Sequence, residues 1–103
     1  MTGGRRGRLL LLAQRPGPAL GPPPKWLTPK EANAWRDVVA VAPDVLRASD
    51  EPGVALVAST LERWRSGIRE AGLLRLVYTM LGDCFIPMRA RRQLLFPDRP
   101  RRR

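Results

Sequence analysis

The sequence predicts an all-α fold of three to four helices: a helical-bundle protomer that follows a disordered or extended basic N-terminal arm. Apolar residues recur at helical spacing between residues 26 and 96, and residues that favour helix starts precede these runs. Nowhere do apolar and polar residues alternate beside hairpin turn residues, as strands require. We therefore divide the chain into a basic Pro/Gly-rich arm and linker (1–25), a helical domain (26–96) and a basic tail (97–103).

The first 25 residues predict a segment without helices. Residues 14–25 hold five Pro and two Gly, which favour extended or polyproline geometry and indicate a linker. Arg5, Arg6 and Arg8 precede an apolar run over 9–13 that resembles the start of a signal or transit peptide. That run is shorter than the roughly 7–15 residues of a signal core. We expect an unstructured or binding-induced arm.

A first helix is predicted to begin at Thr28. Thr28 is the N-cap, Pro29 takes the first helical position, and Glu31 closes a capping box. The helix is expected to run to about residue 42 and to end at Pro43. Spacing of i, i+3, i+4 and i+7 predicts one buried face, made by Trp35, Val38, Val39 and Ala42.

A second, longer helix is predicted after Asp50, which is placed as its cap with Glu51 and Pro52 in the first turn. Its apolar residues are 3, 4, 3, 4 and 3 positions apart, a heptad pattern: Val54, Val57, Leu61, Trp64, Ile68 and Ala71. The core face of a bundle and a seam between subunits fit this spacing equally. Because a domain of about 70 residues buries only about 60% of its unfolded surface, we expect oligomerisation through Val54, Val57, Leu61, Trp64 and Ile68.

The last third of the helical domain predicts two further helices. Gly72 permits a break or a bend, and the apolar stretch 73–81 then reaches Gly82, the expected C-cap. Pro87 is expected at the first position of a short helix over 88–95, which Pro97 stops. Cys84 between the two helices is expected to be a small, buried or half-buried apolar residue.

The residue inventory argues against an enzyme. The chain has no His and one Cys, and no Gly-rich phosphate loop with its Lys. A zinc site needs several ligands, and a disulfide needs two cysteines. We expect no catalytic residue, no metal and no cofactor, and no membrane span because no 18-residue apolar run exists. Three acids are interpreted as solvated helix surface: Asp37, Glu62 and Glu70. Glu62 is within reach of Arg65 for a helical ion pair.

Charge is distributed unevenly along the chain. Residues 1–25 hold five basic and no acidic residues, residues 84–103 hold seven Arg and one Asp, and residues 26–83 hold seven basic and eight acidic ones. Lys and Arg that meet phosphate release condensed counterions, so basic ends are expected where a chain touches a polyanion. The plainer alternative is a pair of disordered tails that keep the protein soluble.

Several motifs occur in a characteristic order. They are a Pro-rich lead-in to Trp26–Ala32 with Trp35 and Val38-Val39, then Leu46–Asp50 before Leu61–Arg65, then Leu81-Gly82 before Phe85–Leu94. Together they resemble the small terminase subunits of tailed bacteriophages, over roughly residues 22–95. Two features depart from that family: the connection after Gly72 is short, and Ile86 stands where the family usually has Thr, so a side-chain cap is lost there.

The resemblance implies a non-enzymatic DNA-packaging adaptor. Such subunits form rings of identical copies, bind double-stranded genome DNA at the packaging-initiation site, and recruit or regulate a large terminase subunit in the host bacterial cytoplasm during virion assembly. The expected DNA contacts are Arg5, Arg6, Arg8, Arg15, Lys25, Lys30 and Arg36. The expected contacts with either DNA or the large subunit are Arg89, Arg91, Arg92, Arg99, Arg101, Arg102 and Arg103.

Two other classes of protein fit the same charge layout. One is a generic basic helical nucleic-acid-binding protein or small regulator. The other is a protein-interaction or targeted organellar subunit whose N-terminus would be cleaved.

Overall fold

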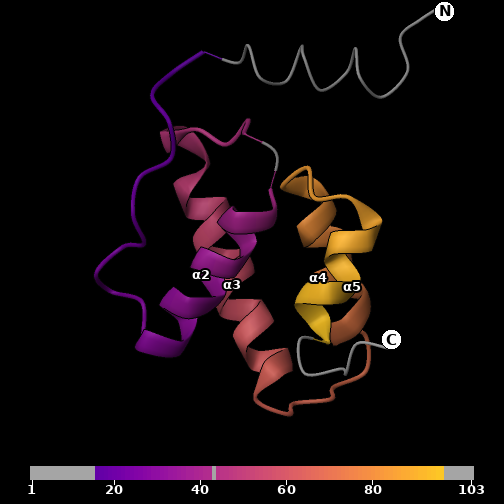
Figure 1. The fold of residues 1–103 in the computed structure, drawn as a ribbon. Coiled ribbons are helices and arrows are strands. Elements are labelled where there is room, and N and C mark those ends of the chain that lie inside the picture. Colours follow the sequence, from indigo (N-terminus) through magenta and orange to yellow (C-terminus); the bar gives the residue numbers. More distant parts are fainter. Residues whose placement is uncertain (1–15, 43, 97–103) are drawn as a thin grey trace, which may run out of the picture.

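The computed structural model describes residues 16–42 and 44–96, and the predicted all-α class is confirmed. Its elements are α2 (Pro29–Val41), the short 3-10 helix η1 (Ala48–Asp50), α3 (Glu51–Arg65), α4 (Leu73–Asp83) and α5 (Met88–Leu95). Figure 1 shows α2 against α3 on one side of the molecule and the α4–α5 hairpin on the other. Helix α3 contacts each of the other elements, so one core serves the whole bundle.

Helix α2 starts as predicted. The Glu31 N–H donates to Thr28 Oγ1 at 3.1 Å, and the Thr28 N–H donates to Glu31 Oε1 at 2.9 Å, which completes the capping box. The C-cap is Ala42, and Pro43 lies outside the described residues. Trp35 and Val38 are buried as predicted, and Ala42 packs against the core half-buried. Ala34 also lies in the core, whereas Val39 is 39% exposed because it is about 100° around the helix from Val38.

The start of α3 corrects one expectation. The Asp50 carboxylate accepts a hydrogen bond from the Arg47 N–H at 2.7 Å, so it closes η1. It makes no side-chain cap to α3, which continues directly from η1. Asp50 does occupy the predicted N-cap position, but a 3-10 turn immediately before the helix takes up its carboxylate.

The heptad stripe is the core of a single chain. Val54, Val57, Leu61 and Trp64 are all buried among the other helices. Ile68 lies beyond the end of α3 and is half-buried against the same core. Of the two interpretations of this spacing, the structure shows the bundle core. The four buried side chains therefore pack within one chain, and the oligomerisation expected through this stripe stays a prediction.

Helix α4 ends two residues later than predicted, with Cys84 as its C-cap, and a close approach explains the glycine inside it. Gly82 lies inside the helix, which extends to Asp83, and the left-handed residue that follows is Phe85, with φ 65°. A Cβ on Gly82 would lie 2.9 Å from an Arg91 guanidinium nitrogen. Gly82 therefore makes room for Arg91 rather than terminating the helix.

Helix α5 is held by its surroundings. Pro87 occupies the N-cap position rather than the first helical one, and no side chain caps the helix. Ile86, Leu94 and Leu95 are buried and fix both ends of the helix in the core. Cys84 is buried, as expected of an apolar residue.

The folded part begins before the predicted boundary at residue 26. The Ala48 N–H donates to the Pro18 carbonyl at 2.9 Å, and the Leu20 N–H donates to the Leu46 carbonyl at 3.3 Å. An isolated antiparallel bridge joins Ala19 to Arg47. Residues 18–20, assigned to the linker by composition, thus form a strap across the connection between α2 and α3.

Candidate nucleic-acid interface

A tight turn before α2 presents the first basic residue. The Leu27 N–H donates to the Pro24 carbonyl at 3.2 Å, which places Lys25 and Trp26 at the centre of the turn. Leu27 is buried and anchors the turn, whereas Lys25 is exposed and Trp26 is 70% exposed. The turn therefore offers a cation and an indole ring to solvent side by side in the sequence.

The N-terminus of α2 is already satisfied from within. Glu31 accepts from the Thr28 N–H through Oε1 and from Ser59 Oγ through Oε2 at 2.9 Å. The hydrogen bond from the Thr28 backbone, and then that from Ser59, lowers the pKa of Glu31. An ionised carboxylate beside the helix N-terminus repels a second anion there, so any phosphate here would be bound by lysine side chains.

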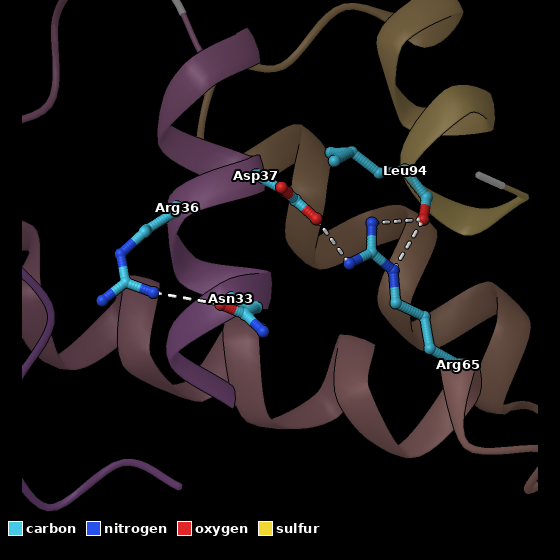
Figure 2. Close-up of polar contacts among 5 residues, drawn as sticks. All are labelled: Asn33, Arg36, Asp37, Arg65 and Leu94. Atoms are coloured by element: carbon cyan, nitrogen blue, oxygen red, sulfur yellow. Dashed lines mark hydrogen bonds and ion pairs between the residues drawn. The ribbon is translucent and has the colours of Figure 1, made fainter. Parts of the chain in front are cut away.

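The exposed face of α2 carries Lys30 and Arg36. Lys30 is exposed and makes no hydrogen bond or ion pair within the described chain. Arg36 donates through Nη1 to Asn33 Oδ1 at 3.0 Å (Figure 2), one turn earlier on the same helix. Its other guanidinium nitrogens are free for a phosphate, and the Asn33 contact restricts the side chain to the outer surface.

Arg65 has the opposite role, and Figure 2 shows it beside the same helix. Its Nη1 pairs with Asp37 Oδ2 at 2.7 Å, and its Nε and Nη2 donate to the Leu94 carbonyl at 3.1 and 2.9 Å. This single side chain therefore links α2, α3 and α5. It also replaces the predicted Glu62–Arg65 pair, and it gives Asp37 a partner where only solvated surface was expected.

Two more arginines near Trp64 are used inside the chain. Arg63 pairs with Glu70 at 3.2 Å, with both side chains half or more exposed. The Arg69 guanidinium lies 3.9 Å from the centre of the Trp64 ring and donates to the Trp64 carbonyl. Trp64 in turn donates through Nε1 to the Leu95 carbonyl at 2.9 Å. These cations stabilise the end of α3 and are weak candidates for phosphate contact.

The predicted basic cluster on α5 divides into two kinds of residue. Arg91 donates through Nε to the Ile86 carbonyl at 2.7 Å and lies 5.1 Å from the centre of the Tyr78 ring. Arg91 therefore packs against its own chain, and its assignment as a DNA or partner contact stays a prediction. Arg89 and Arg92 are exposed, three positions apart on one face, and their side chains make no hydrogen bond or ion pair within the described chain.

The remaining predicted contacts lie outside the described residues, and one cation was missed. Those outside are Arg5, Arg6, Arg8, Arg15, Arg99, Arg101, Arg102 and Arg103. Arg75 on α4 is exposed and has no partner among the described residues. It is the one charged residue in α4 before Asp83, a sequence signal that was available.

The described residues show neither a metal cluster nor a membrane helix. Within 16–42 and 44–96, no three His, Cys, Asp or Glu side chains gather as possible metal ligands. In the same part of the chain no helix is both long enough and apolar enough to cross a membrane. No family model matches the sequence, and no curated protein or solved structure is significantly similar to it. The likeness to small terminases therefore depends on the motifs of the sequence itself.

Proposed function

We propose that this protein is a DNA-packaging adaptor, a terminase small subunit that binds double-stranded genome DNA and recruits or regulates a large terminase subunit. One observation carries the DNA-binding part: a folded centre near neutrality is flanked by two basic ends. The unpaired cations of the described chain support it, because Lys25 and Lys30 lie just before and at the start of α2 and remain free for phosphate.

In this proposal the chain has no catalytic role. It contributes positive charge and a helical scaffold, and the large subunit supplies the chemistry. A ring of copies would need a contact surface beyond the buried residues of the heptad stripe. The exposed large apolar residues of the described chain are Trp26, Val39, Leu56, Leu74, Leu76, Met88 and Phe96. The mass of the full chain in solution tests this part, and a compact monomer would contradict a ring.

Salt-dependent binding of the full chain to duplex DNA, followed by fluorescence anisotropy, tests the proposal. The slope of log K against log salt changes by about 0.9 for each phosphate that the protein no longer neutralises. We expect Lys30→Gln to flatten the slope by up to that amount. Arg63→Gln removes the same charge from a residue paired with Glu70, so its slope should change less.

The two ends are tested separately. Deleting residues 1–15 should flatten the slope by the equivalent of up to about four phosphates, one for each arm arginine. Deleting residues 99–103 should flatten it only if that end also lies on DNA. A slope unchanged by the second deletion favours a protein partner for the tail. An intact protein whose DNA affinity is independent of salt would contradict the proposal as a whole.

A second candidate, a generic binder of single-stranded nucleic acid, is favoured by one residue. Trp26 is 70% exposed beside Lys25, and aromatic rings stack on unpaired bases, a contact of about 1–3 kcal/mol per base. Trp26→Ala should then weaken binding to a single strand far more than to a duplex. An equal effect on both, with duplex bound more tightly, would favour the packaging adaptor.

A further inference from the structure

A surface groove lies between the start of α3 and the end of α4. It is a cavity of about 340 Å³ open to solvent. Leu56, Met80 and Phe85 line it together with Val57 and Cys84. Leu56 is 60% exposed, and Met80 and Phe85 are only half-buried, so apolar surface in the groove is left uncovered by the described chain.

The groove is also negatively charged. Asp50 and Asp83 line it from opposite helices, and no described Lys or Arg does so. Burial, and then the charges of Asp50 and Asp83, raises the pKa of Cys84 to about 11. An occupant that suits this groove is apolar along its length and positively charged at one end.

The chain contains such a segment, and it approaches the groove from nearby. Residues 5–12 read Arg-Arg-Gly-Arg-Leu-Leu-Leu-Leu. The strap brings the Pro18 carbonyl within 2.9 Å of the Ala48 N–H, and the next residue, Ser49, lines the groove. Five residues separate Leu12 from Pro18, so the six steps between them reach up to about 20 Å when extended. The leucines can therefore return to the groove of their own chain.

We propose that residues 5–12 dock in this groove of the same chain, with the leucines covering Leu56, Met80 and Phe85 and the arginines beside Asp50 and Asp83. Docking places the arm arginines against acids of the protein, so a docked arm and a phosphate-bound arm exclude each other. The inference does not depend on DNA binding, since the groove, its charge and the position of the strap are properties of the chain alone.

A spin label near the arm leucines tests the docking without DNA. The full-length chain carries Cys84→Ser, which removes its one cysteine, and Gly7→Cys, which carries the label. We expect the methyl resonances of Leu56 and Met80 to lose most of their intensity. Leu76 on α4 is exposed and does not line the groove, so its methyl resonances should keep their intensity. Equal broadening of all three residues, or of none, would overturn the proposal.

Matched variants then separate docking from chance contact. Replacing Leu9–Leu12 by serine should restore the Met80 signal, because the arm keeps its charge but loses its apolar side chains. Leu56→Lys should also restore it, whereas Leu76→Lys should not, although both leucines are similarly exposed, at 60% and 50%. Folding of each variant is checked by circular dichroism. Persistent broadening in both groove-directed variants would overturn the proposal.

A mixing experiment identifies whose arm is bound. Isotope-labelled chains without the spin label are mixed with unlabelled chains that carry it. We expect no loss of Leu56 or Met80 intensity in the mixture, because each arm occupies its own groove. Broadening in the mixture that matches the single-chain sample would show exchange of arms between copies and would overturn docking within one chain.

Discussion

The two helical pairs of this protein are joined in different ways. Between α2 and α3, side chains distant in sequence form polar contacts: Ser59 donates to Glu31 at 2.9 Å, and Arg65 pairs with Asp37 at 2.7 Å. Between α4 and α5, Leu81 and Ile86 are fully buried. There Arg91 donates to a main-chain carbonyl rather than to an acid. The first pair therefore adds polar partners to its apolar packing, whereas the second relies mainly on apolar packing.

The starts of the helices show the same difference. Thr28 caps α2 through its side chain, whereas Gly72 before α4 and Pro87 before α5 provide no such bond. A side-chain cap acts over three residues and is present in an isolated peptide. Helices without one depend on packing for most of their stability. We therefore expect α4 and α5 to depend more on the common core than α2 does.

Leu61→Ala should have the largest effect because it damages the core that both pairs share. Leu61 is fully buried on α3, the helix that contacts all the others. The truncation should lower the free energy of unfolding by about 2–5 kcal/mol. Chemical unfolding followed by circular dichroism measures this, and Leu76→Ala on the surface is the control. Two separate unfolding transitions in the variant would show that the pairs fold independently.

Arg65→Gln should have the next largest effect, because it removes the link between the pairs. The Leu94 carbonyl loses both donors, Asp37 loses its partner, and the Arg65 side chain is only 17% exposed. We expect the free energy of unfolding to fall by about 1–3 kcal/mol. Arg63→Gln is the matched control, and its exposed pair with Glu70 should be worth less than about 1 kcal/mol. Equal losses in the two variants would contradict the role given to Arg65.

Two glycine-to-alanine changes compare the helices directly. Gly53 in α3 has open space where a Cβ would lie, so Gly53→Ala should stabilise by about 0.4–1 kcal/mol. In Gly82→Ala the new methyl carbon would lie only 2.9 Å from an Arg91 guanidinium nitrogen. The guanidinium must move away, and this offsets the same gain. Thermal unfolding should show a higher melting temperature for the first variant alone. An equal rise in both would mean that the Arg91 contact contributes nothing.

The smallest expected effect is the pH dependence of the α2–α3 contact. The pKa of Glu31 is lowered in the folded chain, so the ionised form is the one that stabilises. That stability is present above the unfolded value near 4.5 and is lost as the pH falls through the folded pKa. Unfolding measured from neutral to acid pH should show a shallower decline for Glu31→Gln. Glu62→Gln on α3 is the control, and an equal change there would contradict the assignment.

The sequence predicts local features well and tertiary ones poorly. Thr28 and Glu31 could be identified because a capping box depends on neighbours in the chain. Asp50 was placed correctly at the N-cap of α3, but its side-chain bond was not, because η1, three residues long, competes for the same carboxylate. Gly82 was misassigned because its neighbour, Arg91, comes from another helix.

The candidate interface follows the same division. Exposure of Lys25, Lys30 and Arg36 was predictable from their positions before and on the polar face of α2. The internal role of Arg91 was not, because charge alone does not show whether an arginine has a carbonyl to bind. The heptad stripe could not distinguish a core from a subunit contact, since both bury the same face of a helix.

The exposed indole before α2 also has an optical consequence. The chain has three tryptophans, and their environments differ: Trp26 is 70% exposed, whereas Trp35 and Trp64 are 2% and 6% exposed. An aqueous quencher reaches the first and not the other two, and buried indoles emit at shorter wavelength. The emission of the unmodified protein therefore contains one component from the turn at Lys25 and another from the core. Quenching of the first by added DNA, with the second constant, would report binding without a dye.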